Sequence, residues 1–137
     1  FRGEVKASVQ IRDMRFSNVD EDKLFKSQSL YEKYRRREAL TQHEARFLTP
    51  TREFLLGVYG VLKQYKLWQY DIETLTYRAK CPIERYCTML VSVDVLCELG
   101  LIKRESGQLI FDGEGKKADL SQSEILNNLN RIQGGEQ

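Results

Sequence analysis

Residues 71–111 read DIETLTYRAKCPIERYCTMLVSVDVLCELGLIKRESGQLIF and contain two helical patterns in succession. Asp71 is a typical N-cap for the first helix, and Cys81-Pro82 turns the chain sharply into the second. Gly100 ends the second pattern, at the position where a glycine commonly follows a helix. Two helices joined by so short a turn predict a helix-turn-helix.

Two short apolar runs follow the second helix. Leu101-Ile102 and Leu109-Ile110-Phe111 flank the polar turn residues Glu105 to Gln108, a pattern that predicts a β-hairpin. A helix-turn-helix followed by a hairpin indicates a winged-helix-like domain, in which the hairpin is the wing. We expect this domain over residues 49–132, in a chain that is mainly α-helical with a small β-hairpin.

The first core helix of this domain should lie just before the helix-turn-helix. Apolar residues recur at helical spacing from Phe54 to Tyr65, and Thr49-Pro50 predicts a helix start with proline in the first helical position. Gly57 and Gly60 interrupt this helix, where each costs about 1 kcal/mol relative to alanine. We therefore expect another backbone to cross the helix closely at the two glycines.

A charged segment precedes the domain. Residues 17–48 predict a basic helical arm, whose first helix runs toward Leu40 and whose second begins at a capping box formed by Thr41 and Glu44. Residues 1–16 contain a strand with alternating apolar side chains, which needs partner strands from outside this chain to bury its apolar face.

The C-terminal end predicts one more helix. Ser121 and Glu124 have the spacing of a capping box, which places the start of the helix at these residues. Residues 133–137 are expected to form a disordered tail.

The chain offers few residues for catalysis or metal binding. Its three cysteines form no C-x-x-C pair, and Cys87 and Cys97 fit an apolar helix as small core residues. His43 is the only histidine and lies in a polar helix, where a solvated side chain is the favoured interpretation. We expect no catalytic residue and no metal ligand here. The absence of a long apolar run or an export signal predicts a soluble, cytoplasmic protein without membrane contact.

The second helix of the helix-turn-helix lacks the charge of a DNA-reading helix. Arg85 is its only cation, and Glu84, Asp94 and Glu98 would oppose a phosphate backbone. Helices that read a DNA groove normally present several cations to phosphates and bases. We expect this helix to pack against protein instead.

The basic residues are concentrated in the N-terminal part. Residues 1–49 hold 11 Lys and Arg against 8 Asp and Glu, a net charge of +3, whereas residues 50–137 hold 11 against 12. Cations and an aromatic ring alternate on the arm, as in surfaces that bind single-stranded nucleic acid. The candidate contacts are Lys33, Tyr34, Arg35, Arg36, Arg37, Arg46 and Arg52. The same pattern also fits a solvated helix face.

Four segments of the chain resemble a known family when they are taken together and in order. They are residues 1–15, LTPTREF with the following Val58-Tyr59 and Leu62, LCELGLI at residues 96–102, and KKADLSQS at residues 116–123. They are similar to the last strand of the OB domain and to the accessory C-terminal region of the single-stranded-DNA-specific exonuclease RecJ from Gram-positive bacteria.

This resemblance implies a parent enzyme that degrades single-stranded DNA from its 5′ end with Mg or Mn. The catalytic core of that family contains Asp and His motifs, including an Asp-His-His run, and none of them occurs in this chain. The strand in residues 1–16 would then close an OB domain. Arg12 and Arg15 would approach DNA only in the complete barrel.

The expected function is therefore that of a non-catalytic module of an exonuclease of recombination and repair. Such a module would dock on the catalytic core or a repair protein and guide single-stranded DNA along its basic arm. The alternative is a dimeric winged-helix regulator that binds duplex DNA, and a structural brace without a ligand is a third interpretation.

Overall fold

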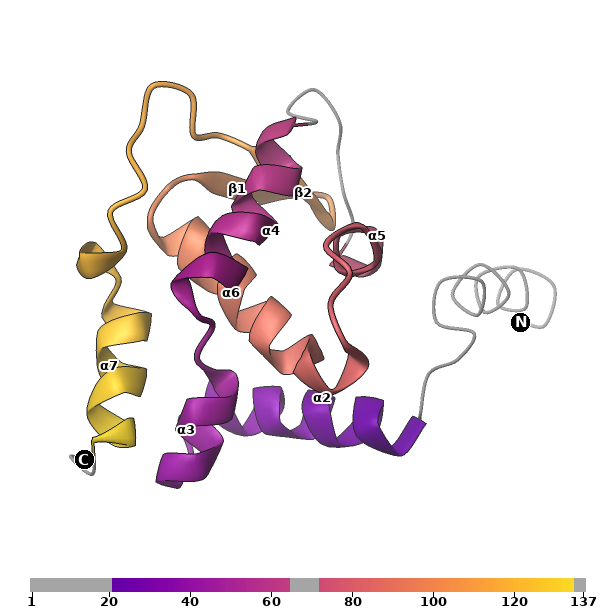
Figure 1. Cartoon of the computed structure of the whole chain (residues 1–137), viewed down its shortest axis with the longest axis vertical. Coiled ribbons are helices and arrows are strands. Elements are labelled where there is room, and N and C mark those ends of the chain that lie inside the picture. Colours follow the sequence, from indigo (N-terminus) through magenta and orange to yellow (C-terminus); the bar gives the residue numbers. More distant parts are fainter. Residues whose placement is uncertain (1–20, 65–71, 135–137) are drawn as a thin grey trace, which may run out of the picture.

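A computed structural model of the chain describes residues 21–64 and 72–134 (Figure 1). In these ranges the protein is mainly helical with one small antiparallel sheet, as the sequence predicted. The elements are α2 (Glu21–Arg35), α3 (Gln42–Leu48), α4 (Arg52–Gln64), α5 (Ile72–Arg78), the 3₁₀ turn η1 (Ile83–Arg85), α6 (Tyr86–Glu98), β1 (Ile102–Glu105), β2 (Gln108–Phe111), the 3₁₀ turn η2 (Leu120–Gln122) and α7 (Glu124–Gln133). No helix in the described ranges is long and apolar enough to cross a membrane.

Helix α6 lies at the centre of the molecule (Figure 1). It is apolar nearly all round, the pattern of a helix that is surrounded by protein. Helices α2, α3, α4 and α5 and strand β1 all pack against it. Its fully buried side chains include Met89, Val91, Val93, Val95 and Leu96.

Helix α2 packs against α6, which it crosses obliquely (Figure 1). The Ser27 hydroxyl accepts a hydrogen bond of 2.7 Å from the Cys87 amide and donates to the carbonyl of Glu84. One helical turn further, the Tyr31 hydroxyl donates to Asp94 at 2.8 Å. The described part of the expected arm therefore packs on the domain. Ala45 and Leu48 of α3 belong to the same buried core, which continues across the boundary expected at residue 49.

The last residue of α2 and the first residue of α4 differ from the prediction, whereas the start of α3 agrees with it. Thr41 and Glu44 form the predicted capping box at α3. Helix α2 ends at Arg35 and does not reach Leu40, because Arg37 adopts the left-handed conformation at φ 59° and terminates the helix. Helix α4 begins at Arg52, after Pro50, because the Thr51 hydroxyl accepts from the amide of Phe54.

The C-terminal end of α6 and the turn of the hairpin have the backbone conformations that their sequences predict. Gly100 has φ 74°, and its amide bonds to Cys97 while the next amide, that of Leu101, bonds to Leu96. This pair of hydrogen bonds is a Schellman motif. In the hairpin, Ser106 and Gly107 both have positive φ, the geometry of a two-residue type I′ turn between antiparallel strands.

The N-cap of α7 is Ser123, not Ser121. The Ser123 hydroxyl accepts from the Leu126 amide, whereas Ser121 lies in η2 and bonds to Asp119. The predicted capping box is therefore wrong, because η2 occupies the residues that should open the helix. The expected tail also begins too early, since Gln133 is the last residue of α7 and its side chain donates to the Thr49 hydroxyl at 2.7 Å.

The expected close crossing at Gly57 and Gly60 is wrong. Both glycines are exposed, and a Cβ atom built on either would have no neighbour within 4 Å. The glycines therefore lie on the solvent side of α4, so overpacking is not expected there.

Replacing Gly57 or Gly60 with alanine should stabilise the protein. Alanine lowers the backbone entropy of the unfolded chain and restores helix propensity, a gain of about 0.5–1 kcal/mol for each substitution. Equilibrium urea denaturation of each variant measures this gain. Gly113→Ala is the contrasting control, because a Cβ there would overlap the Tyr59 hydroxyl and press on the Phe111 ring. A loss of stability in Gly57→Ala would place that glycine in a packed contact.

Candidate nucleic-acid interface

The carboxylates of α6 are engaged in holding the fold together. Asp94 accepts from the Tyr31 hydroxyl and forms an ion pair of 2.8 Å with Arg104 of β1. Glu98 accepts from the Ser123 hydroxyl at 2.6 Å and from two amides in the first turn of α7. These side chains join α6 to α2, the hairpin and α7.

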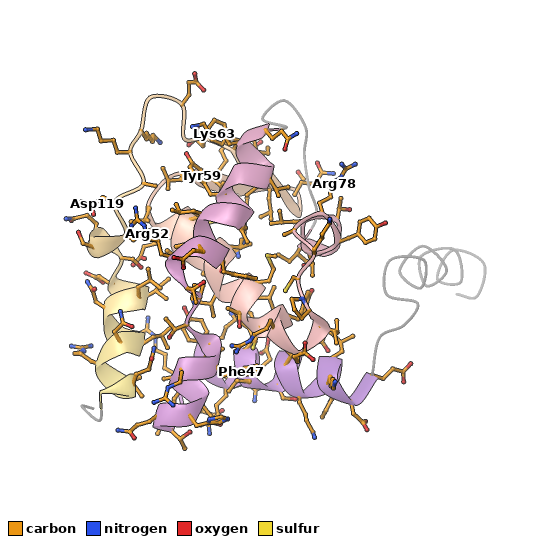
Figure 2. All side chains as sticks on the ribbon, viewed as in Figure 1. Phe47, Arg52, Tyr59, Lys63, Arg78 and Asp119 are labelled. Carbon is orange, nitrogen blue, oxygen red and sulfur yellow. The ribbon has the colours of Figure 1, made fainter. Side chains whose placement is uncertain are left out.

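Arg85 is likewise engaged within the protein. Its guanidinium donates to the Phe47 carbonyl at 3.1 Å and stacks over the Phe47 ring, 4.2 Å from the ring centre. The Thr88 hydroxyl donates to the same carbonyl at 2.8 Å. Figure 2 shows Phe47 on α3, close to α2. Arg85 therefore anchors α3 to the start of α6.

The cations near the hairpin have partners as well. Arg104 forms the ion pair with Asp94 described above. The Lys103 ammonium group lies 3.2 Å from the carboxylate of Glu105 on the same strand. Lys116 donates to the Gly100 carbonyl at 2.8 Å, at the C-terminal end of α6. The last carbonyls of a helix carry partial negative charge, so a lysine is favourable at this position.

At the C-terminal end of α2, Lys33 is held by an ion pair. Its ammonium group lies 2.9 Å from Glu44, the acidic member of the α3 capping box. The hydrogen bond from the Thr41 amide and the bond from Lys33 lower the pKa of Glu44. Lys33 therefore joins α2 to α3, and it is only about one-third exposed.

Tyr34 is half-buried beside Tyr31, with the two ring centres 5.7 Å apart. Burial raises the pKa of Tyr34 to about 12, and the negative charge of Asp94 adds to this effect. The hydroxyl is protonated at neutral pH, as in any tyrosine, and can donate a hydrogen bond.

Arg35, Arg36 and Arg37 are all exposed where α2 ends. The Arg35 guanidinium lies 5.9 Å from the centre of the Tyr31 ring, and Arg36 is 3.9 Å from Glu38, at the limit of an ion pair. Surface pairs of this kind contribute little to stability. The three arginines therefore form a part of the predicted basic surface that is accessible to a ligand.

The remaining candidates lie elsewhere or outside the described residues. Arg46 is exposed on α3, and Arg52 is exposed at the start of α4. In Figure 2 Arg52 lies at the left of the view, beside α4 and above the level of α2. Arg12 and Arg15, with the expected strand in residues 1–16, fall outside the described residues.

An open groove lies next to the end of α2. Its walls are residues 34, 35 and 37–40, the α6 residues Asp94 and Glu98 and one face of α7, and its volume is about 1290 Å³. Tyr34, Arg35 and Arg37 line this groove, together with Arg131 of α7. The predicted contacts Lys33, Arg36, Arg46 and Arg52 are not among its lining residues.

The α7 wall could not be found from the sequence. Asn127, Asn128 and Arg131 face the groove, but they lie more than 90 residues along the chain from α2. In the sequence these residues are recognisable only as part of the polar face of the last helix. The fold alone brings them opposite Arg35 and Arg37.

In the described ranges no three His, Cys, Asp or Glu side chains lie together in a way that would hold a metal ion. Cys87 is buried, and burial raises the pKa of the Cys81 thiol to about 12, so both thiols stay protonated at neutral pH. His43 is exposed on α3.

Comparison with protein-family models, with curated proteins and with solved structures found no match to this chain.

Proposed function

We propose that this chain is the non-catalytic C-terminal module of a RecJ-like exonuclease of recombination and repair. The four segments that resemble this family support the proposal, and so does the order of the elements. Helices α4, α5 and α6 followed by the β1–β2 hairpin fit a helix-turn-helix with a wing. In the parent enzyme a separate core, using Mg or Mn, carries out catalysis in the cytoplasm.

The position of α6 favours a role other than duplex reading. In a winged helix, the second helix of the helix-turn-helix enters the major groove. Here α2 packs along that helix, and the Arg85, Asp94 and Glu98 side chains bond within the protein. A surface already covered by α2 cannot also enter a DNA groove. This supports docking on the nuclease core or on a repair protein as the role of the domain.

The observation that carries the nucleic-acid part of the proposal is the exposure of three consecutive arginines. Arg35, Arg36 and Arg37 lie on the surface at the end of α2, next to a half-buried tyrosine. Arginines bind phosphates through their planar guanidinium groups, without regard to base sequence. We therefore propose that this surface guides single-stranded DNA toward the core of the parent enzyme.

Reversing these arginines should abolish binding to single-stranded DNA. The wild-type protein should bind a labelled oligonucleotide weakly, without sequence preference, and with an affinity that falls steeply with salt because bound cations displace counterions. The triple substitution Arg35→Glu, Arg36→Glu and Arg37→Glu should remove this binding. Fluorescence anisotropy at several salt concentrations measures both effects, with thermal denaturation as the check on folding.

A matched control separates this surface from exposed lysines elsewhere on the domain. Lys63, Lys103 and Lys117 are exposed, and changing all three to Glu alters the net charge by the same amount. This control should keep most of the single-strand affinity. If the wild-type protein instead prefers duplex DNA and the control loses that binding, the protein is a duplex-binding regulator. If the wild-type protein binds no DNA at low salt, its proposed DNA-guiding role is wrong.

A further inference from the structure

Helix α7 lies at the edge of the molecule and presents a mixed charged and apolar face to the groove beside α2 (Figure 1). Leu126 and Leu129 are buried on its other side and hold the helix against the domain. The residues of the α7 face are exposed or half-buried and recur at helical spacing. They are Glu124, Ile125, Asn128, Arg131 and Ile132.

The charge of this groove is nearly balanced. Its lining holds four carboxylates against three arginines, namely Glu38, Asp94, Glu98 and Glu124 against Arg35, Arg37 and Arg131. Such a surface does not favour a ligand with charge of one sign only. A matching partner carries charges of both signs, each placed opposite its counterpart, as complementary protein surfaces do.

The order of the charges on α7 makes a second copy of the same helix complementary to it. Glu124 lies in the first turn and Arg131 in the last, about 10 Å apart along the helix axis. Asn128 lies midway between them to within one residue. A two-fold rotation about an axis near Asn128, perpendicular to the helix, therefore exchanges the positions of Glu124 and Arg131. In the resulting antiparallel pair each Glu124 faces Arg131 of the second copy, and this contact occurs twice.

The same rotation also matches the apolar residues of the α7 face. It places Ile125 opposite Ile132 of the second copy, on the side of the face nearer the core. Asn128 then lies opposite its own copy, and two side-chain amides can bond to each other because each both donates and accepts. Asn128 now accepts from Arg131 of its own helix, and in the pair Glu124 of the second copy replaces that acceptor.

We propose that two copies of this chain associate through their α7 faces, as an antiparallel helix pair about a two-fold axis near Asn128. The interface is small, since a stable one buries about 800 Å² on each partner and one face of a 10-residue helix offers less. The dimer is therefore weak, with a dissociation constant of about 10–500 µM. The inference goes beyond the proposed function and does not rest on it, because it concerns the protein without nucleic acid.

The test is sedimentation equilibrium of the full chain without DNA, at concentrations up to about 1 mM. Glu124→Arg makes both paired positions positive and Arg131→Glu makes both negative, so each variant should weaken its own dimer by about tenfold. An equimolar mixture of the two should recover the wild-type affinity, because the positive face of one variant meets the negative face of the other. Glu105→Arg on the hairpin is the matched control and should change the affinity by less than about twofold.

A second variant tests the position of the two-fold axis. Asn128→Arg sets two cations against each other at the axis and should abolish the dimer. Asn130→Arg is its matched control, because Asn130 is exposed on the same helix but does not line the groove. This control should dimerise like the wild type. Thermal denaturation checks that each variant is folded.

The outcomes either support this pair of helices or overturn it. A wild-type protein that stays monomeric at about 1 mM would overturn the proposal. So would a dimer with unchanged affinity in Asn128→Arg, or a mixture of the two charge variants that recovers no affinity, because the copies would then meet through another surface. A glutamate is favourable at a helix N-terminus, so Glu124→Arg can lower the melting temperature. In that case the comparison of Asn128→Arg with Asn130→Arg decides.

Discussion

Replacing Leu48 with alanine should lower the free energy of unfolding by about 2–5 kcal/mol. Leu48 is the last residue of α3, and its side chain is completely buried in the central core. Truncation to alanine removes apolar contacts and leaves a cavity that the surrounding helices fill only in part. Equilibrium urea denaturation, followed by circular dichroism, measures the loss.

The matched control for this prediction is Phe25→Ala. Phe25 lies on α2 and is 69% exposed, so its removal should change the free energy of unfolding by less than about 0.5 kcal/mol. Similar effects of the two substitutions would mean that α3 does not belong to the core. Cooperative folding of a chain that begins at residue 49 would contradict the prediction in the same way, because it would show that the core forms without α3.

The sequence predicted those features that depend on neighbouring residues. The capping box of Thr41 and Glu44, the glycine at position 100 and the hairpin turn are all confirmed. Each of them is specified within about six residues, and the physical cause is local backbone geometry or a local hydrogen bond. The predominance of helix follows in the same way from apolar spacing.

The sequence did not reveal which helices cap one another. Ser27 of α2 accepts the bond from an amide at the start of α6, 60 residues further on, and Glu98 of α6 caps α7 from 26 residues away. Capping rules compare residues three positions apart, so they cannot detect such contacts. For this reason the sequence predicts Ser121 as the N-cap where the structure has Ser123, and it shows Glu98 only as a charge that would oppose a phosphate backbone.

The same limit applies to the candidate interface. The run Lys33 to Arg37 stands out in the sequence. In the structure, however, Lys33 forms an ion pair with Glu44, and only Tyr34, Arg35 and Arg37 of the run line the groove. Exposure and pairing depend on how α2, α6 and α7 pack together. The composition identified the basic segment. Only the fold shows which of its side chains face α7 across the groove.

Replacing Glu98 with alanine should lower the free energy of unfolding by about 2–3 kcal/mol, because a hydrogen bond to a charged group is worth about 1.5–3 kcal/mol. The Glu98 carboxylate accepts from the Ser123 hydroxyl and from the amides of Glu124 and Ile125. Without it, the first amides of α7 lose their partners and the negative charge that favours a helix N-terminus. Urea denaturation measures the loss, and Glu32→Ala on the exposed side of α2 is the control, with an expected change below about 0.5 kcal/mol.

Glu98→Gln and a double-mutant cycle separate the causes. Glutamine keeps an acceptor oxygen but loses the charge, so its effect should lie between those of the wild type and Glu98→Ala. Ser123 bonds both to Glu98 and to the Leu126 amide, and therefore Ser123→Ala and Glu98→Ala should be non-additive by about 0.5–3 kcal/mol. Strict additivity would mean that the two side chains act on α7 independently. A Glu98→Ala variant as stable as the wild type would show that α7 is held by its apolar face alone, through Leu126 and Leu129.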